Sequence, residues 1–206
     1  MRGPRSPLLG LLAGALLVGG CGPAADPYAT VAQVRGPWRS EPLALSPAAQ
    51  EAAEAACKDS RAALVNGLPL EQLAVIDARG TGRITVIFGG AGAAFTRCEL
   101  RMTAEGGLEQ AGGWTRRSAG DNLLLPPDGL TIESGGGMLG GEGLASNASG
   151  RFGGAVNSVR FVFASGTVIQ ASVGLGWYTA WWPTDEMDFV VEAYDRAGQK
   201  IAEVER

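Results

Sequence analysis

The chemistry open to this chain is limited by the side chains it lacks. The sequence contains no histidine, which excludes Ser-His-Asp and Cys-His catalysis, histidine-ligated metals and the usual general base near neutral pH. A Ser-x-x-Lys nucleophile motif is also missing. What remains is carboxylate chemistry, as in a glycosidase pair, or a hard-cation site built from oxygen ligands.

The carboxylates that could do this chemistry fall in predicted loops and turns. Asp185, Glu186 and Asp188 cluster together, but they lack the glycine and the ligand spacing of an EF-hand loop. Aspartate at a turn commonly caps backbone N–H groups, and three further aspartates stand at predicted turns: Asp77, Asp121 and Asp128. We interpret both sets as solvated or capping residues and predict no catalytic residue, no metal site and no cofactor.

Cys21 ends a segment with the composition of an export signal. Two arginines precede an apolar run from Leu8 to Gly20, which is shorter than the about 20 residues that a helix needs to cross a bilayer. The run ends in Val18-Gly19-Gly20-Cys21 and resembles the signal peptide (residues 1–20) and lipobox of a bacterial lipoprotein. The resemblance implies a lipid on Cys21 and a domain anchored at the extracytoplasmic face of the cell membrane. A retained interfacial helix and an ordinary secretory signal are the alternatives.

The two other cysteines are Cys57 and Cys98. With Cys21 assigned to lipid they form an even pair, and a disulfide between them suits an oxidising exterior. Such a bond would close a loop of about 40 residues, worth on the order of 4 kcal/mol in the chain-entropy model. Two buried free thiols are the alternative.

The charge balance limits the partners. The formal net charge is −4, and it becomes −6 when residues 1–20 are removed. A nucleic-acid surface would need clustered basic residues, so we expect no nucleic acid. The expected partners are the membrane, through the lipid on Cys21, and an unidentified protein or cell-wall component.

The elements expected before residue 126 form a tether and an α+β lobe. Residues 21–45 are proline-containing and aperiodic, which predicts a tether, with Trp38 docked on the domain. Ser46 and Pro47 suit a helix N-cap and first position, and the helix is predicted to run to about Val65. The residues expected on its inward face are Ala49, Ala52, Ala53, Ala56, Cys57 and Leu64.

Beyond this helix the hydrophobic period changes to two. Residues 73–76 and 83–88 flank a predicted turn at 77–82, and residues 95–102 and 108–114 flank another at 104–107. A helix over four antiparallel strands predicts an α+β lobe over residues 46–125.

Residues 126–206 predict an all-β lobe. The lobe begins at the turn sequence Pro126–Gly129, and further turns are expected at Ser165-Gly166 and at 195–198. About seven short strands suggest a small immunoglobulin-like β-sandwich. We expect it to abut the first lobe; a single core shared by the two lobes is the alternative. The glycine-rich run 135–140 matches the letters of a dinucleotide fingerprint, but no helix follows it, so we predict a glycine loop.

The most distinctive part of this lobe is the aromatic segment 176–183. On a strand, Trp177, Thr179 and Trp181 would face one side, and Tyr178, Ala180 and Trp182 the other. If exposed, its four aromatic residues would form a binding platform for sugar rings or a partner protein: Trp177, Tyr178, Trp181 and Trp182. The alternative is that they pack between the two lobes.

A longer pattern surrounds this segment. Gly-Trp…Ala-Trp-Trp-Pro at 176–183 is followed by Tyr194, Asp195 and Gly198. The stretch from Val159 to Val204 is similar to a C-terminal pattern in uncharacterised exported proteins of high-G+C Gram-positive bacteria. This resemblance implies a domain type and a location outside the cell, and no activity.

Together these observations predict a membrane-anchored extracytoplasmic lipoprotein. We expect a non-enzymatic binding or accessory module that acts through Trp177–Trp182. A carboxylate-dependent glycan hydrolase is the alternative from another class, and it requires two acids facing each other across a groove. A purely structural envelope lipoprotein is the third interpretation.

Overall fold

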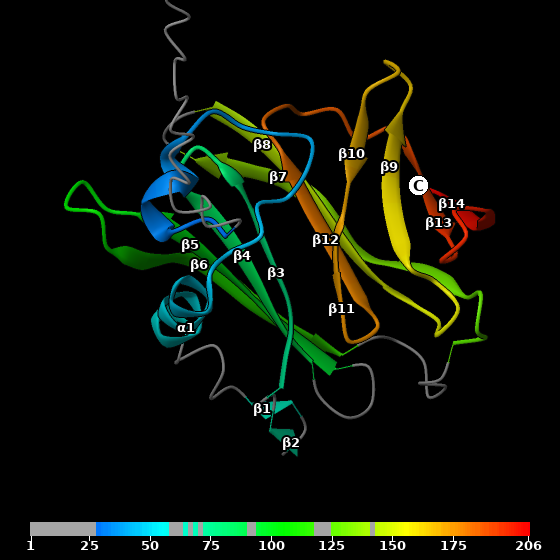
Figure 1. The fold of residues 1–206 in the computed structure, drawn as a ribbon, viewed down its shortest axis with the longest axis horizontal. Helices are drawn as coiled ribbons and strands as arrows, with labels where there is room; N and C mark the ends of the chain where they lie inside the picture. Colours follow the sequence, from blue (N-terminus) through cyan, green and yellow to red (C-terminus); the bar gives the residue numbers. More distant parts are fainter. Residues whose placement is uncertain are drawn as a thin grey trace, which may run out of the picture.

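The computed structural model describes residues 28–57, 72–89, 94–117, 125–140 and 143–206, together with the short strands β1 (Leu64–Val65) and β2 (Leu68–Pro69). Within these residues the fold is mostly β, with one α-helix and three four-stranded antiparallel sheets (Figure 1). Cys21 and the predicted signal segment lie outside the described residues. No helix in the described part of the chain is long and apolar enough to cross a membrane.

The chain from residue 28 to residue 45 packs on the domain, so the predicted tether is wrong for these residues. It contains the 3-10 helix η1 (Val31–Arg35), in which Val34 is fully buried. The backbone N–H groups of Arg39 and Leu43 then donate to carbonyls of the adjacent strand at 2.9 and 2.7 Å. We call residues 28–45 the strap. Buried apolar groups and these hydrogen bonds offset the entropy of ordering it, and Trp38 is docked as predicted.

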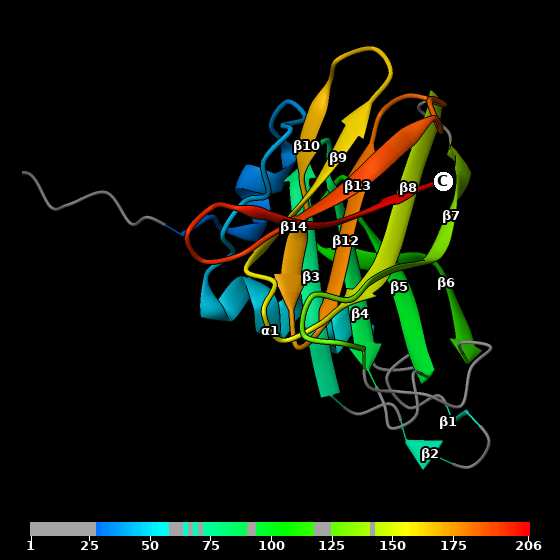
Figure 2. The ribbon, with the colours of Figure 1, turned by 90° about the vertical axis from the view of Figure 1, so that its right-hand side faces the viewer.

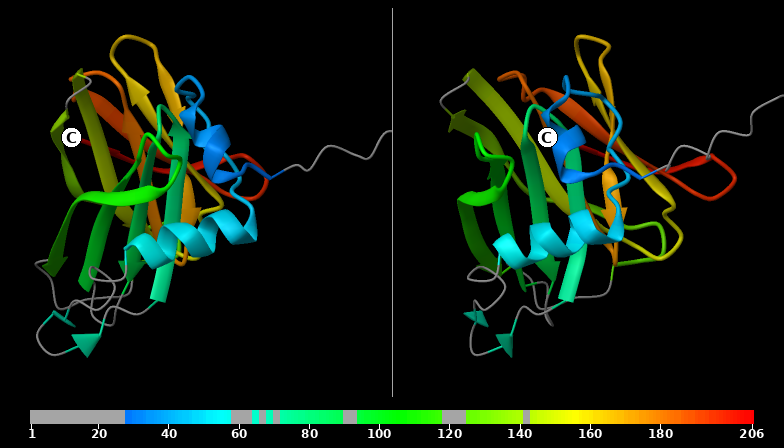
Figure 3. Two further views of the ribbon diagram at one scale, coloured as in Figure 1. Left: turned by 90° about the vertical axis from the view of Figure 1, so that its left-hand side faces the viewer. Right: turned by 60° about the vertical axis from the view of Figure 1, so that its left-hand side comes forward.

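Helix α1 (Pro47–Ala56) starts as predicted and ends early. The Ser46 hydroxyl accepts the Ala49 backbone N–H at 3.2 Å, so Ser46 is the N-cap. The predicted extension to Val65 is wrong, because Leu64 and Val65 pair in β1 with β2. The helix follows η1 and is therefore not the first element of the fold. It lies across one face of the first sheet (Figure 3).

The first sheet, called the N-terminal sheet, has the order β3-β4-β5-β6. Its strands are β3 (Gln72–Gly80), β4 (Arg83–Gly89), β5 (Ala94–Met102) and β6 (Leu108–Arg117). The hairpin predicted at 104–107 is confirmed, but the turn predicted at 77–82 is shorter. Thr81 and Gly82 both have positive φ, 50° and 72°, which makes a two-residue turn and leaves Asp77 inside β3.

A disulfide joins α1 to the N-terminal sheet. Cys57, at the end of α1, is bonded to Cys98 of β5, and their Cα atoms lie 6.0 Å apart. This confirms the predicted pair. The bond lies in a buried cluster between the strap, α1 and the sheet: Ala29, Val34, Leu45, Ala49, Ala53, Cys57, Ala78, Ile84, Val86, Phe88, Cys98 and Leu100.

Two further sheets form a sandwich. The middle sheet has the order β11-β12-β8-β7, with β7 (Leu130–Gly140), β8 (Gly143–Phe152), β11 (Ser172–Gly174) and β12 (Trp177–Trp182). The C-terminal sheet has the order β10-β9-β13-β14, with β9 (Ser158–Phe163), β10 (Val168–Gln170), β13 (Phe189–Tyr194) and β14 (Lys200–Glu205). The glycine run 135–140 lies in β7 and pairs with β8, so the predicted loop is wrong.

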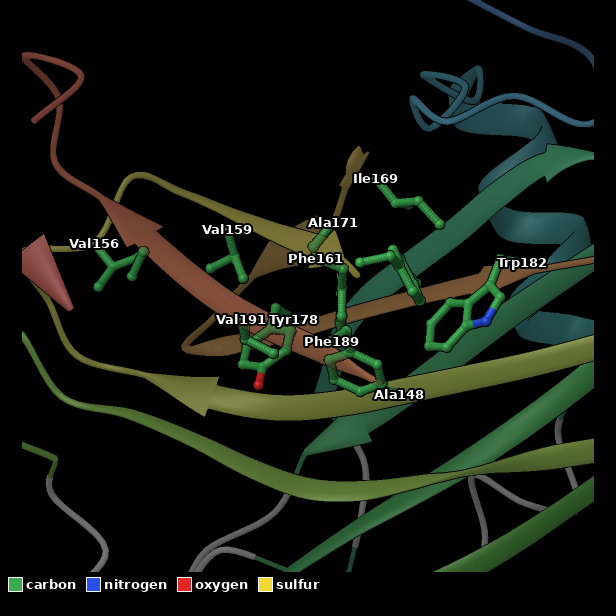
Figure 4. Close-up of a cluster of buried hydrophobic side chains, with 13 residues drawn as sticks. Ala148, Val156, Val159, Phe161, Ile169, Ala171, Tyr178, Trp182, Phe189 and Val191 are labelled. Carbon is green, nitrogen blue, oxygen red and sulfur yellow. The ribbon is translucent and has the colours of Figure 1, made fainter. Parts of the chain in front are cut away.

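The sandwich core is aromatic (Figure 4). Phe161 has ring neighbours in Tyr178, Trp182 and Phe189, with centroids 5.8, 5.6 and 5.3 Å away. The first two pairs join β12 of the middle sheet to β9 of the C-terminal sheet, and Trp182 also lies 5.5 Å from Phe189 of β13 between ring centroids. Aromatic pairs at such distances contribute beyond their buried area.

The three sheets are stacked, with α1 on the outside of the first (Figures 1 and 2). The middle sheet is shared, because its second face packs on the N-terminal sheet. A smaller apolar cluster lies in that interface: Ala74, Val75, Ile87, Phe95 and Trp177. At Gly174, an added Cβ would lie 2.2 Å from the carbonyl oxygen of Ala74, so β11 meets β3 there without room for a side chain. The two predicted lobes thus abut closely.

Candidate functional site

Residues Trp177–Trp182 of the aromatic segment form β12, and all six are buried. Trp177, Tyr178, Trp181 and Trp182 are exposed by 6, 0, 2 and 2 %. The predicted alternation is present, but a strand between two sheets has both faces covered. The exposed platform is therefore wrong. Packing between the two lobes is confirmed for Trp177 and Trp181, whereas Tyr178 and Trp182 lie in the sandwich core of the second lobe.

Three of the four aromatic residues make a ring contact or a side-chain hydrogen bond inside the fold. Trp177 stacks on Phe95 at 4.4 Å between ring centroids. The Tyr178 hydroxyl donates to the Thr131 carbonyl at 2.7 Å, and burial raises the pKa of Tyr178. The Trp182 indole N–H donates to the Glu186 carbonyl at 2.8 Å. Together with the contacts of Tyr178 and Trp182 to Phe161 of β9, these residues join the middle sheet to both other sheets.

Trp181 differs from these three residues. Its indole Nε1 is buried and has no hydrogen-bond partner among the described residues. Trp38 of the strap contacts it edge to face, with 6.5 Å between ring centroids, and the Arg83 guanidinium lies 5.7 Å from its ring centroid. Trp181 also lines the groove described next.

A groove lies at the end of the N-terminal sheet where its two hairpin turns meet Trp181 of β12. Its volume is about 950 Å³. The β3–β4 turn, the β5–β6 turn and the adjoining parts of β4, β5 and β6 form most of its lining. The charged and aromatic lining residues are Arg35, Arg83, Glu99, Arg101, Glu109 and Trp181.

The charges of the groove come from the alternation of β5. Arg97, Glu99 and Arg101 share the face turned toward the middle sheet, while Cys98 and Leu100 face α1. We did not identify these charged residues from the sequence, although the Arg-x-Glu-x-Arg spacing was the available signal. Such a charged face ordinarily faces water, and here the middle sheet covers part of it.

Several of these charges are already engaged. Arg101 Nη2 lies 2.8 Å from Glu109 Oε1, and Arg97 Nε lies 3.2 Å from Glu99 Oε1. Arg35 donates to the backbone carbonyls of the β5–β6 turn. Arg83 makes no ion pair within the described part of the chain; its guanidinium lies over Trp181. Arg83 is therefore the lining cation available to a ligand.

Arg97 lies behind the lining and is fully buried. Its Nη1 donates to the Asn147 side chain, and Asn147 lies opposite Trp181 in the β8–β12 register. Its Nε and Nη2 have no hydrogen-bond acceptor of good geometry among the described residues. Burial lowers the pKa of Arg97, and the carboxylates of Glu99 and Asp77 oppose that shift. Arg97 Nη2 and Trp181 Nε1 are thus buried donor nitrogens beside the groove that have no acceptor among the described residues, and Arg97 Nε has only its ion-pair contact with Glu99.

The carboxylates of the groove do not face each other. Glu99 and Glu109 belong to adjacent strands of one wall, and each contacts an arginine. The lining residue that comes from β12 is Trp181, which carries no carboxylate. The described lining residues therefore do not form the opposed acid pair that glycoside hydrolysis requires.

The other sequence candidates lie elsewhere. Glu186 accepts hydrogen bonds from the backbone N–H and hydroxyl of Ser165 and closes a surface turn. Asp128 is exposed in the predicted turn at 126–129, whereas Asp77 is buried against Arg79. Asp121 and Cys21 lie outside the described residues. Within those residues no group of three or more His, Cys, Asp and Glu side chains is placed to hold a metal ion.

No protein-family model, curated protein or solved structure matches this chain.

Proposed function

We propose that this chain is a lipid-anchored extracytoplasmic module that binds a partner, without catalysis, through the groove at Trp181. The lipobox-like sequence at Val18–Cys21 supports the anchor. The observation that carries the binding role is the groove itself, because it lies at the end of the N-terminal sheet against Trp181 of the middle sheet and has buried donors beside it. An immunoglobulin-like sandwich is part of the proposal, supported by two four-stranded antiparallel sheets packed face to face.

The length of chain between Cys21 and the folded domain sets how far that domain can lie from the membrane. The Ala29 N–H donates to the Ala44 carbonyl at 2.7 Å, so the fold already holds the chain at this residue. Eight residue steps separate Ala29 from Cys21, and a fully extended chain of that length spans about 28 Å. A lipid on Cys21 would therefore keep the body close to the bilayer, and the partner is expected in the membrane or in the envelope next to it.

The test uses the full chain in its native membranes. We expect mass spectrometry to find a lipid on Cys21 and Cys21→Ser to release the protein from the membrane fraction. Crosslinked partners should be lost with Arg83→Gln and retained with Arg196→Gln, which changes an exposed arginine in the β13–β14 turn. An unmodified Cys21 thiol would contradict the anchor. If the Arg83→Gln variant crosslinks to the same partners as the wild type, the result would favour a purely structural envelope lipoprotein.

A further inference from the structure

We propose that the groove recognises an acidic, extended peptide segment of the partner, with Arg83 as the carboxylate-binding residue and β6 as the strand to which the segment adds. This inference rests on the proposed binding function and names its ligand. Three features support it: the charge of the lining, the donors beside it and the position of β6 at the edge of the N-terminal sheet.

The charge of the groove opposes that of the chain. Its lining holds three arginines and two glutamates, whereas the whole chain has a net charge of −4. Glu109 is paired with Arg101 and Glu99 with the buried Arg97. The acids are thus neutralised within the protein, and the guanidinium of Arg83 is left as an attractive site for a negative group.

The position of Arg83 suits a carboxylate. Its guanidinium lies over the indole ring of Trp181, and a guanidinium on an aromatic face keeps a planar edge that can bind a carboxylate through two parallel hydrogen bonds. Two buried donors beside it, Trp181 Nε1 and Arg97 Nη2, also have no acceptor among the described residues, while Arg97 Nε has only its ion-pair contact with Glu99. The groups that could bind a ligand are hydrogen-bond donors, so a matching ligand carries acceptors.

The neighbouring strand supplies a reason for an extended peptide. β6 is the last strand in its sheet order and pairs with β5. Gln110 and Ala111 of β6 line the groove, and Gly112 and Gly113 follow them. Ala111 and Gly113 are exposed, and Ala111 lies at a β-bulge between the paired residues Gln110 and Gly112. An exposed sheet edge can accept an added strand whose main-chain hydrogen bonds provide affinity.

The experiment uses the full lipidated protein in an uncharged detergent at low ionic strength. The probe is a fluorescein-labelled peptide of about ten residues in which Asp and Glu alternate with Thr and Val. Its controls are the Asn/Gln isostere and a Lys version, and binding is followed by fluorescence anisotropy. We expect saturable binding of the acidic peptide, about tenfold or more tighter than that of the isostere.

The variants distinguish Arg83 from general charge. Arg83→Gln should weaken the acidic peptide about tenfold or more, Arg83→Lys should have an intermediate effect because it keeps charge and loses the planar fork, and Arg196→Gln should change nothing. Equal thermal midpoints for the three variants would show that the fold is intact. Equal binding of the acidic and amide peptides, or equal affinities of the Arg83→Gln and Arg196→Gln variants, would overturn the inference. Inorganic phosphate or acetate that displaces the peptide at similar concentrations would show a simple anion site and would also overturn it.

Backbone methylation tests the addition to β6 without changing the protein. In an added strand only alternate N–H groups point to the sheet. Methylating one alternate set of peptide amides should therefore abolish binding, and methylating the other set should leave it. Equal binding of both methylated peptides would overturn strand addition. If no acidic peptide binds but partner crosslinking in membranes still requires Arg83, the ligand class is wrong and the proposed function stands.

Discussion

At the scale of single residues, a buried ion pair holds the layers together. Arg79 Nε lies 3.0 Å from both oxygens of Asp77, and neither side chain is exposed. Ser172 of β11 donates to Asp77 at 2.6 Å. Arg79 Nη1 donates to the Ser40 carbonyl of the strap at 2.6 Å, and Nη2 donates to the Gln170 carbonyl of β10. Asp77 and Arg79, which lie on the same face of β3, thus contact the strap, the middle sheet and the C-terminal sheet.

Asp77→Ala should destabilise the protein by about 3–5 kcal/mol, because it leaves the Arg79 charge buried without its counter-charge. Urea unfolding measures this loss. The control Asp128→Ala changes an exposed turn residue and should stay within about 0.5 kcal/mol of the wild type. Adding Arg79→Met to Asp77→Ala should recover much of the loss. Similar unfolding midpoints for Asp77→Ala and Asp128→Ala would contradict this role.

Tyr178 should make stability depend on pH in alkaline solution. Burial raises its pKa above the ordinary value of 10.0, so above pH 10 the unfolded chain loses a proton that the native state keeps. Stability should therefore fall as pH rises, by up to about 1.4 kcal/mol per pH unit for this group, with no contribution below pH 10. Denaturation of Tyr178→Phe should lack this part of the slope. The control Tyr28→Phe, at an exposed position, should retain the wild-type slope, and an unchanged slope in Tyr178→Phe would disprove the assignment.

At the scale of elements, β5 has two different environments. One of its faces carries Cys98 and Leu100 into the core under α1, and the other carries Phe95 and Arg97 to the interface with the middle sheet. Because Cys98 is bonded to Cys57, the same strand holds the helix and forms a wall of the groove. The disulfide therefore helps to hold in place the strand that forms one wall of the groove.

Removal of this disulfide should cost about 4 kcal/mol, the chain-entropy value for a loop of its length. We expect the Cys57→Ala/Cys98→Ala double variant to show this loss in chemical denaturation. Dithiothreitol should lower the unfolding midpoint of the wild type toward that of the double variant and leave the double variant unchanged. A wild-type midpoint that does not respond to complete reduction would refute a stabilising role.

At the scale of the whole molecule, the strap would join the proposed lipid anchor to the folded domain. Val34 and Leu45 lie in the core of the N-terminal sheet, and the Trp38 indole N–H donates to the Trp181 carbonyl at 3.2 Å. Gly80 has φ 111°, and an added Cβ there would lie 2.3 Å from the Pro37 carbonyl oxygen, so strap and sheet are in close contact. Any pull on the anchor would thus act on the groove-forming sheet.

A chain that begins at residue 46 should be less stable than one that begins at residue 28. Deleting residues 28–45 removes the burial of Val34 and Leu45, worth about 1.5–3 kcal/mol each, and exposes the sheet beneath them. Thermal and urea unfolding of the two chains measure the difference, with the full chain as reference. Equal midpoints for the two shortened chains would show that the strap is a tether after all.

The sequence determined the features that depend on near neighbours along the chain. The N-cap at Ser46, the hairpin turn at 104–107 and the alternation of Trp177–Trp182 follow from local hydrogen bonding, backbone sterics and the period of a strand. The pairing of Cys57 with Cys98 followed from counting cysteines. Each of these features depends on neighbours along the chain or, for the disulfide, on a cysteine with one candidate partner.

Only the tertiary structure decided what covers each face. Periodicity shows which side chains of a strand lie together, but a charged face such as that of Arg97 and Glu99 has the same pattern whether water or another sheet lies over it. For the same reason the sequence left open whether Trp181 was exposed, and the predictions of a tether at residues 28–45 and of a glycine loop at 135–140 were wrong. These outcomes depend on surfaces contributed by distant segments, and the groove exists because the N-terminal and middle sheets bring such segments together.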